Sequence, residues 1–241
     1  MHNTPVALIT GASRGIGAAI ALEFAANGYD LILTCHKSMD LLQALCEGIT
    51  EKYQVKCTPV QADISDESDV NRLFENITQL DVLVNNAGIS YIGLLSGMSW
   101  TDWQTVINTN LSSCFLTCRA AIPLMLQDHA GRIINISSVW GNVGASMETA
   151  YSASKGGMNA LTKALAKELA SSGIQVNAIA CGVIDTTMNA CFTEEERAAL
   201  QEEIPADRFG KPEEVAQLAL HLAQAPDYLT GQIITLDGGW I

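Results

Sequence analysis

Short apolar runs alternate with longer stretches of helical periodicity along this chain. Seven runs are apolar almost throughout, which is the pattern of strands buried on both faces: Val6–Thr10, Asp30–Cys35, Val55–Val60, Asp81–Asn85, Gly131–Ser137, Ile174–Ala180 and Gln232–Leu236. The segments between them predict helices at Ile16–Asn27, Met39–Lys52, Glu67–Gln79, Trp103–Gln127, Thr149–Ser171 and Glu213–Gln224. This alternation predicts a doubly wound α/β fold, with one parallel sheet of seven strands, helices on both faces and right-handed crossovers.

The segment 184–209 interrupts this alternation. Thr193 precedes three glutamates, and Glu196 stands three residues after it, which predicts a helix that begins with a capping box. We interpret the segment as a loop and a short helix inserted before the last helix–strand pair. An insertion at the carboxyl edge of a sheet is well placed to act as a substrate lid. The same residues would equally suit a solvated acidic helix.

Length and composition fit one domain that spans residues 1–241. The chain has 241 residues, of which 48% are hydrophobic, and that content excludes an intrinsically disordered protein. No Pro- or Ser-rich linker, internal repeat or low-complexity tract divides the chain, and α/β folds often reach about 250 residues as one unit.

Charge and hydropathy restrict the partners and the compartment. Lys and Arg number 13 against 26 Asp and Glu, so the net charge is −13, and no basic cluster offers a surface for nucleic acid or an anionic membrane. No apolar stretch approaches the ~20 residues that span a bilayer, and the N-terminus does not resemble a secretory leader. The seven cysteines fit reduced thiols, and a zinc site at Cys114 and Cys118 is disfavoured. We therefore expect a cytoplasmic protein without a bound metal.

A glycine-rich turn follows the first predicted strand. Residues 10–17 read Thr-Gly-Ala-Ser-Arg-Gly-Ile-Gly, with glycines at 11, 15 and 17. Glycines allow a sharp turn and let backbone N–H groups at a helix N-terminus approach a pyrophosphate. Glycine-rich turns are common, but this one lies between a buried strand and a helix, as dinucleotide binding requires.

The end of the second predicted strand bears on which dinucleotide binds. Many dinucleotide folds place an acid there to bind the ribose 2′-hydroxyl, but this chain has Cys35, His36, Lys37 and Ser38. Lys37 and Arg14 would instead attract a 2′-phosphate, unless Lys37 is simply a solvated surface residue. We predict a preference for NADP(H) over NAD(H).

Small and polar residues follow the third and fourth predicted strands. Asp63 could contact an adenine or belong to a capping turn, in which Ser65 would be the cap. Asn86, Ala87 and Gly88 follow the fourth strand, where small side chains would let a ligand come close to the backbone. Taken alone, this second segment is an ordinary turn.

Four polar residues suggest proton transfer. Tyr151 and Lys155 are four residues apart and share a helix face. An ammonium group beside a phenol lowers a phenol pKa from about 10, which suits proton exchange with an alcohol oxygen. Ser138 lies at the end of the fifth predicted strand, on the edge where α/β sheets bind ligands. Asn110 is unfavourable inside a helix, which indicates a polar role or a helix irregularity.

The glycine turn, the segment Asn85-Asn86-Ala87-Gly88, the interval from Ser138 to Tyr151, and the Tyr-x3-Lys spacing occur here together and in order. This combination resembles the classical short-chain dehydrogenase/reductase family over essentially the whole chain. The resemblance implies a Rossmann-type domain, interconversion of a ketone and an alcohol with a nicotinamide cofactor, and a homotetramer built on the two long helices.

By this resemblance, each matching residue takes a family role. Tyr151 would be the general acid in ketone reduction, and Ser138 would hydrogen-bond the substrate carbonyl. Lys155 would lower the pKa of Tyr151 and hold the nicotinamide ribose, and Asn110 would hold a water in a proton relay to Lys155. The cofactor would be bound by Gly11, Ser13, Arg14, Gly15, Ile16, Gly17, His36, Lys37, Asp63, Ile64, Asn86, Ala87, Gly88, Tyr151, Lys155, Gly182, Ile184 and Thr186.

One position departs from the family pattern. The family usually has Pro-Gly after the sixth strand, whereas this chain has Cys181-Gly182. Because cysteine lacks the fixed φ of proline, we expect a more mobile loop at this point. Cys181 could be a reactive thiol, but a buried inert thiol is the favoured interpretation.

Two groups within the family suggest substrates. The residues 208–215 and 230–240 resemble bacterial 3-oxoacyl-(acyl-carrier-protein) reductases, whose acidic carrier would need cations such as Arg119, Arg132, Lys163 or Lys167 at the cleft mouth. The loop 138–146 resembles reductases of the 5-aminopentanone group on elongation factor P. In that case Trp140 and Met147 would line the substrate site, and we place Met188 there too. Steroid, sugar and other small ketones, and a non-catalytic cofactor-binding protein, are the further alternatives.

Overall fold

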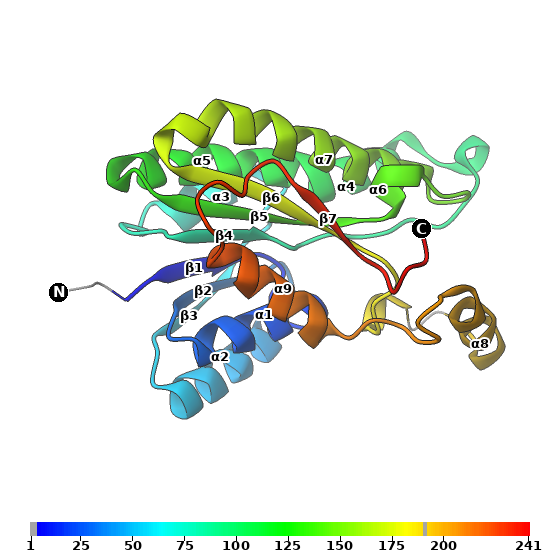
Figure 1. Ribbon diagram of the computed structural model, residues 1–241, viewed down its shortest axis with the longest axis horizontal. Helices are drawn as coiled ribbons and strands as arrows, with labels where there is room; N and C mark the ends of the chain where they lie inside the picture. The colour runs from blue at the N-terminus through cyan, green and yellow to red at the C-terminus, as the bar shows by residue number, and fades with distance from the viewer. Residues whose placement is uncertain (1–3, 190–191) are drawn as a thin grey trace.

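A parallel sheet forms the centre of the computed structural model, which describes residues 4–189 and 192–241 (Figure 1). Within these residues seven strands pair in the order β3-β2-β1-β4-β5-β6-β7. Their bounds are β1 Val6–Ile9, β2 Asp30–Cys35, β3 Cys57–Gln61, β4 Val82–Asn85, β5 Gly131–Ser138, β6 Ile174–Cys181 and β7 Ile233–Leu236. The prediction of a seven-stranded parallel Rossmann-type sheet is confirmed. The strand order reverses between β1 and β4, and a crevice that can bind a ligand opens at the carboxyl ends of the strands beside such a point.

Helices cover both faces of the sheet (Figure 1). One face carries α1 (Gly15–Ala26), α2 (Met39–Tyr53) and α9 (Pro212–Ala223), and the other carries α3 (Glu67–Phe74), α4 (Trp100–Ile107), α5 (Ser113–Asp128) and α7 (Thr149–Leu169). Each layer has its own cluster of buried apolar side chains. No helix in the described part of the chain is long and apolar enough to cross a membrane.

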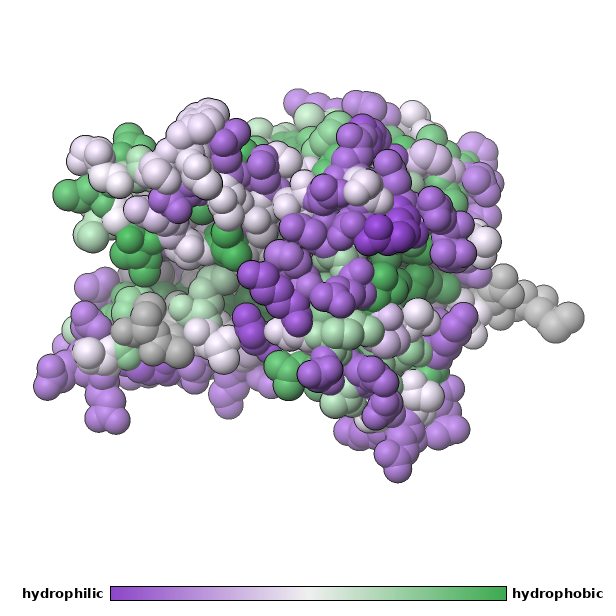
Figure 2. Space-filling view, turned by 180° about the vertical axis from the view of Figure 1, so that it is seen from behind, coloured by the Kyte–Doolittle hydropathy of each residue, from purple (hydrophilic) through white to green (hydrophobic). Residues whose placement is uncertain are grey.

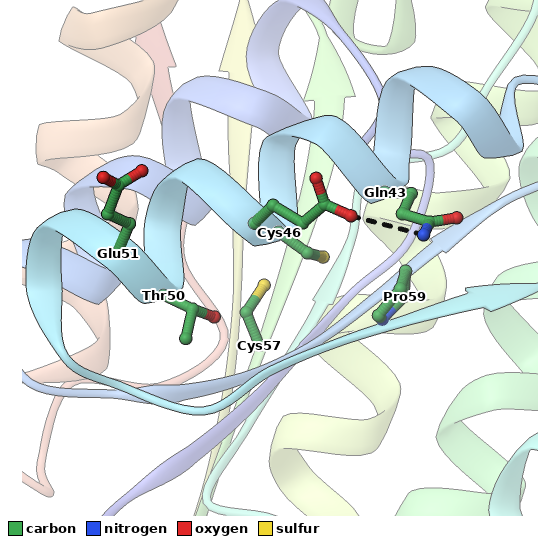
Figure 3. Close-up of a pocket in the computed structure, with 7 residues that line it drawn as sticks. Gln43, Cys46, Thr50, Glu51, Cys57 and Pro59 are labelled. Carbon is green, nitrogen blue, oxygen red and sulfur yellow. Dashed lines mark hydrogen bonds between the residues drawn. The ribbon is translucent and has the colours of Figure 1, made fainter.

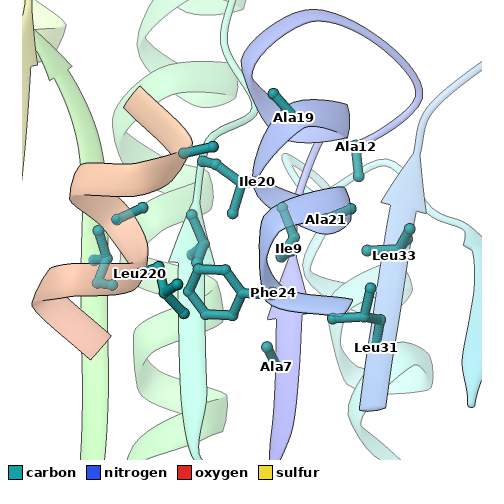
Figure 4. Packing of buried hydrophobic residues seen from close by; sticks show 14 of the residues in the cluster. Ala7, Ile9, Ala12, Ala19, Ile20, Ala21, Phe24, Leu31, Leu33 and Leu220 are labelled. Atoms are coloured by element: carbon teal, nitrogen blue, oxygen red, sulfur yellow. The ribbon is translucent and has the colours of Figure 1, made fainter. Parts of the chain in front are cut away.

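The packing of α1 and α9 on the sheet fixes the position of the first strand and helix of the fold (Figure 4). Ile20 and Phe24 on α1 are fully buried, together with Leu31 and Leu33 on β2, and Leu220 on α9 packs in the same cluster. Full burial of each large side chain contributes about 1.5–3 kcal/mol. This packing holds the N-terminus of α1 at the carboxyl end of β1, which positions the glycine-rich turn.

The predicted helix Trp103–Gln127 is divided in the structure. A π-helical segment, η2 (Asn108–Ser112), separates α4 from α5 and contains the fully buried Asn110. The helix irregularity that the sequence indicated at Asn110 is therefore confirmed. Single π-turns of this kind often mark functional sites.

The helices after β3 and after β5 differ from the prediction. The helix predicted at Glu67–Gln79 ends as α3 at Phe74, because the chain turns there to bury Ile77 and Leu80. A short helix that the pattern did not predict, α6 (Trp140–Val143), follows β5 directly and packs on α7. Short 3-10 turns at η1 (Leu95–Gly97) and η3 (Ala170–Ser172) were also not predicted.

The insertion at 184–209 contains η4 (Thr187–Asn189) and α8 (Glu194–Glu203). The capping box on Thr193 and Glu196 is confirmed. The two ends of the insertion are joined: Asp185 N donates to Gly210 O (2.8 Å), and Gly210 N donates to Val183 O (2.9 Å). The helix α8 buries no side chain and stands apart from the sheet, beside the C-terminus (Figure 1).

Candidate active site

The glycine-rich turn is bonded to the end of β4. The hydroxyl of Thr10 accepts hydrogen bonds from the backbone N–H groups of Asn86 (3.0 Å) and Ala87 (3.1 Å). The amide of Asn86 donates in return to the carbonyls of Thr10 (2.8 Å) and Gly11 (3.1 Å). The side chain of Asn86 therefore holds two loops together. Thr10 was not singled out in the sequence, although it stands immediately before the first glycine.

Two glycines are required by this close packing. Gly11 has φ +65°, and a Cβ there would lie 2.8 Å from Cα of Ala87. A Cβ on Gly17 would lie 2.6 Å from the carbonyl oxygen of Gly11 and 2.5 Å from Nδ2 of Asn86. Side chains at either position would push the two loops apart, so both glycines set the shape of the turn.

The N-terminus of α1 faces this turn and is suited to an anion. No side chain caps α1 within the described residues, and its first turn has no acidic residue. Ser13 is part-buried, Arg14 is exposed at the N-cap, and Gly15 and Ile16 begin the helix. A Cβ on Gly15 would lie 3.5 Å from Cγ2 of Thr186, so the loop after β6 reaches the same place. The structure thus brings the predicted phosphate-binding residues together with Thr186.

A cleft of about 420 Å³ lies at the carboxyl ends of β2 and β3. It is lined by His36, Lys37, Gln61, Asp63, Asp69 and Arg72. Asp63 lies 3.6 Å from His36 Nε2, and its other oxygen accepts from Ser65 N (3.0 Å) and Ser65 Oγ (2.7 Å). His36, Lys37 and Asp63, which were all predicted to bind the cofactor, therefore meet here. Arg72, which forms an ion pair with Asp69 (2.6 Å), adds a cation that the sequence did not single out.

Ile64 was also predicted to bind the cofactor, but its surroundings differ from those of the other predicted residues. Its side chain is buried and packs in an apolar cluster with Val70 and Leu116. Only the backbone of Ile64 can therefore face a ligand. Ala87 also packs against this cluster.

Ser138, Tyr151 and Lys155 are brought together at the carboxyl end of β5. The hydroxyl of Ser138 lies close enough to that of Tyr151 to lower the pKa of the phenol. The Lys155 ammonium lies 5.6 Å from the centre of the Tyr151 ring and donates to the Ile136 carbonyl (2.7 Å). The first turns of α7 carry the tyrosine and the lysine on one face, as their spacing predicts.

Loss of contact with water sets the pKa values of Tyr151 and Lys155. Desolvation raises the pKa of Tyr151 above its ordinary value, and the hydrogen bond with Ser138 opposes part of the increase. Desolvation lowers the pKa of Lys155 to about 8. The expectation that Lys155 lowers the pKa of Tyr151 is therefore wrong for the protein alone. The physical reason is that desolvation dominates at the phenol, while the Lys155 ammonium is directed at the backbone carbonyl of Ile136.

Asn110 connects the π-helical segment to the same group. Its Nδ2 donates to Ile89 O (2.9 Å) and Ser154 Oγ (3.0 Å), and its Oδ1 accepts from Ile89 N (2.8 Å). A Cβ on Gly88 would lie 3.2 Å from Oδ1 of Asn110 and 3.5 Å from Nζ of Lys155. Gly88 therefore lies between the two polar side chains, and a larger residue would displace them.

The loop after β6 lies across from β5. Cys181 pairs with Ser138 in the register of the sheet and is buried, and burial raises its pKa to about 12. A protonated, buried thiol agrees with the inert interpretation. Gly182 packs closely against Asp237, and the Ile184 side chain is part of the core, which leaves only its backbone for a ligand.

Two tryptophans lie beside the catalytic group. Trp140 N donates to Ser138 Oγ (3.2 Å), and its ring meets the ring of Trp240 edge-on, with centroids 5.0 Å apart. Asp237 holds the C-terminal tail by accepting from the backbone N–H groups of Gly239 (3.0 Å) and Ile241 (2.9 Å). Trp240 ends the segment 230–240 that carried a resemblance in the sequence, but only the fold brings its ring against Trp140.

The end of the molecule that carries α8 is hollowed and bordered by apolar side chains (Figure 2). The described chain exposes large apolar side chains in the loops after β4, β5 and β6, namely Ile92, Leu94, Leu95, Val143, Met147 and Met188. Met147 has φ +64°, and its carbonyl accepts from Gly93 N (2.8 Å), so the loops after β4 and β5 are joined. Both predicted substrate methionines are thus exposed.

Two of the predicted docking cations are already engaged. Arg119 forms an ion pair with Glu67 (2.5 Å), and Arg132 forms one with Asp227 (2.7 Å). Lys163 and Lys167 are exposed on α7. Of the four cations named for docking an acidic carrier protein, two are therefore already paired with acids.

The residues present fit a dinucleotide. The uncapped N-terminus of α1 and the glycines beside it suit a pyrophosphate, and the cations of the cleft at β2 and β3 suit the adenosine end. No group of His, Cys, Asp or Glu side chains suited to a metal ion occurs in the described residues. The fold and this site define an NAD(P)-dependent oxidoreductase.

Comparison with known proteins narrows the class. Residues 5–197 match the family model described as short chain dehydrogenase, so the chain belongs to the short-chain dehydrogenase/reductase family. It is 42% identical over 239 residues to 3-oxoacyl-(acyl-carrier-protein) reductase FabG of Aquifex aeolicus, covering 97% of this chain and 96% of that protein. It is 39% identical over 236 residues to the uncharacterized oxidoreductase YmfI of Bacillus subtilis, covering 97% and 98%.

A solved structure supports the same assignment. The chain superposes with a TM-score of 0.93 and 35% identity on an Agrobacterium tumefaciens protein assigned as a candidate gluconate dehydrogenase, covering 98% of this chain and 95% of that one. The relatives therefore share the fold and the oxidoreductase class while their names point to different substrates.

Proposed function

We propose that this protein is an NADPH-dependent reductase that converts a ketone into a secondary alcohol, with 3-oxoacyl groups on acyl carrier protein as substrate. The observation that carries the proposal is the part-buried Tyr151, which lies beside Ser138 and Lys155. The names of relatives such as the Aquifex aeolicus reductase support the substrate.

The residues of the site divide the chemistry between them. The bound nicotinamide supplies the hydride. Ser138 donates a hydrogen bond to the ketone oxygen, and Tyr151, kept protonated by its burial, gives its proton to that oxygen as negative charge develops. Lys155 holds the cofactor ribose and, with Asn110 and a water, returns a proton to Tyr151.

The lid, the compartment and the assembly are part of this proposal. The insertion predicted at 184–209 includes residues 190–191, which lie outside the described residues; its described parts, 184–189 and 192–209, close over the substrate as one hinged unit, because the insertion's two ends are bonded together at Asp185 and Gly210. The enzyme acts in the cytoplasm as a homotetramer, which is supported by the exposed Trp100 and Phe115 on α4 and α5. Sedimentation velocity measures the assembly directly, and a monomer would contradict it.

Lys37→Ala is expected to raise the KM for NADPH about fivefold and to leave the KM for NADH unchanged. Lys37 is exposed in the cleft, where one ion pair with a 2′-phosphate is worth about 1 kcal/mol. Steady-state kinetics with each cofactor checks this. Lys56→Ala, an exposed lysine outside the cleft, serves as the control. A wild-type enzyme that prefers NADH would contradict the cofactor assignment.

The rate of ketone reduction is expected to fall as the pH rises through about 8. Desolvation lowers the pKa of Lys155 to about 8, so its ammonium deprotonates there, whereas the raised pKa of Tyr151 keeps the phenol protonated. The measurement is the pH profile of kcat/KM for NADPH-dependent reduction. A profile that stays flat across this range would show that the charge of Lys155 is not needed.

A second substrate is favoured by the aromatic pair of Trp140 and Trp240 beside Ser138. The 5-aminopentanone group of elongation factor P combines a ketone with an amine that is protonated at neutral pH. Indole rings attract such a cation, and a protein of net charge −13 attracts it further. The same charge repels an acidic carrier protein, and Arg119 and Arg132 are already paired with acids.

Two ketones tested side by side separate these candidates. The assay follows NADPH consumption with acetoacetyl-acyl carrier protein and with elongation factor P that carries the ketone. Rapid turnover of the thioester supports the first candidate. Turnover restricted to elongation factor P, lowered about tenfold by Trp140→Leu through loss of the cation–π contact, supports the second. Failure of both substrates in the presence of bound NADPH redirects the search to small ketones.

A further inference from the structure

A second cavity lies away from the cofactor site, between α2 and the edge strand β3. Its volume is about 490 Å³, and it is lined by Gln43, Cys46, Glu47, Thr50, Glu51, Cys57 and Pro59 (Figure 3). Gln43 donates to Glu47 (3.3 Å) at its rim. Cys57 is the first residue of β3, whereas the cofactor cleft lies at the carboxyl ends of β2 and β3. The cavity therefore opens at a different part of the sheet.

Two cysteine side chains face each other in this cavity. Cys46 extends from the buried face of α2, where Leu42 and Ile49 also lie, and Cys57 extends from β3. Both sulfur atoms lie in the gap between α2 and β3 (Figure 3), and the two side chains line the same cavity. Cys46 is 3% exposed, and Cys57 is part-exposed and opens to solvent through the cavity.

The contact between the thiols makes their protons unequal. The hydrogen bond from Cys57 lowers the pKa of Cys46, and the same bond together with burial raises the pKa of Cys57. Cys46 is therefore the thiol of the pair that loses its proton first. A more acidic thiol beside one that stays protonated is the arrangement of an attacking and a resolving cysteine.

We propose that Cys46 and Cys57 form a dithiol oxidation site, which a hydroperoxide converts to a disulfide in the folded protein. The resulting bond links α2 to the edge strand β3. The proposal rests on the facing thiols and the cavity that admits the oxidant, and it is independent of the substrate of the reductase.

The reaction balances in two displacements. The Cys46 thiolate attacks one peroxide oxygen, so that an S–O bond forms, the O–O bond breaks, and the released hydroxide takes up a proton to leave as water. The Cys57 sulfur then attacks the Cys46 sulfur, forming the S–S bond and breaking the S–O bond. The departing hydroxide takes the Cys57 proton and leaves as a second water. The two thiols lose two electrons in total, and the peroxide accepts them.

A second pair of neighbouring thiols provides the contrast. Cys114 and Cys118 lie one helical turn apart on α5 and are 1% and 2% exposed. Both accept weak hydrogen bonds from the Asn85 amide (3.4 Å each), and burial and the contact with Cys118 raise the pKa of Cys114. No cavity described above reaches them. We therefore expect these thiols to stay reduced under conditions that oxidise Cys46 and Cys57.

The experiment treats the reduced full-length protein with hydrogen peroxide at stoichiometric amounts. Remaining thiols are alkylated, and the disulfide is located by peptide mass spectrometry without reduction. The expected result is a peptide pair that joins Cys46 to Cys57, with Cys114 and Cys118 alkylated. A disulfide between other cysteines, or stable sulfenic acid on Cys46 without a disulfide, would overturn the proposal.

Variants and a direct probe of the reduced protein complete the test. Cys57→Ser is expected to stop oxidation at sulfenic acid on Cys46, and Cys118→Ser is the matched control that still forms the Cys46–Cys57 bond. Phenylarsine oxide bridges two adjacent thiols, and on wild-type protein it is expected to protect both Cys46 and Cys57 from alkylation. Alkylation of both thiols at an unchanged rate would contradict the facing geometry even if a variant failed to fold.

Discussion

Replacing Tyr151 with phenylalanine is expected to lower kcat for ketone reduction by about 10²–10⁴-fold while the affinity for NADPH stays unchanged. The substitution removes only the phenolic hydroxyl, which is the proposed proton donor, and general acid catalysis contributes an effect of this size. The ring stays in place beside Lys155, whose ammonium lies 5.6 Å from its centre. The glycine turn is held by hydrogen bonds between Thr10 and Asn86, which the substitution does not touch, so cofactor binding is expected to be unaffected.

The measurement combines steady-state turnover with a binding titration. Loss of kcat with unchanged binding assigns Tyr151 to a step after the cofactor binds. Tyr228→Phe is the matched control, because that residue is 99% exposed and its hydroxyl is outside the site. Retention of more than half of the wild-type kcat in Tyr151→Phe would contradict the mechanism. Loss of cofactor binding would instead indicate a structural role.

Replacing Asn110 with alanine is expected to lower the free energy of unfolding by about 3 kcal/mol, because each buried partner left without a hydrogen bond costs about 1–3 kcal/mol. The substitution leaves the backbone N–H and carbonyl of Ile89 without their partner and removes the hydrogen bond that the Ser154 hydroxyl accepts. Because Gly88 lies between Asn110 and Lys155, reductase activity is also expected to fall.

Chemical denaturation measures the stability of this variant. The matched control is Asn108→Ala, since Asn108 lies in the same π-helical segment but is exposed, and surface changes of this kind are worth within about 0.5 kcal/mol. Equal stability losses in the two variants would show that helix propensity, and not the hydrogen bonds of Asn110, determines the effect.

The hydrophobic pattern predicted the sheet well because burial on both faces leaves a clear signature. β2 was predicted at its observed bounds, Asp30–Cys35, since every residue in it faces an apolar layer or its edge. The end of α3 was predicted too late because Ile77 continues the helical spacing although it is buried from a turn. The short α6 gives too little periodicity to be detected.

Some features of the candidate site were likewise predictable from the sequence, and others were not. Spacing placed Tyr151 and Lys155 on one face, and the strand pattern placed Ser138 at the correct edge, so the position of each residue followed from local geometry. The direction of the pKa shift at Tyr151 was predicted wrongly. That shift depends on how much water the surrounding loops remove, which a sequence motif does not encode.

By itself, the sequence determined the doubly wound fold, the family and the position of the motif residues, because these follow from local periodicity and spacing. Tertiary structure alone decided which distant residues meet: Trp240 against Trp140, Arg72 beside Lys37, and Cys46 facing Cys57. In each case the two residues belong to different elements, and their chemistry depends on distance and burial, which arise only when the layers pack.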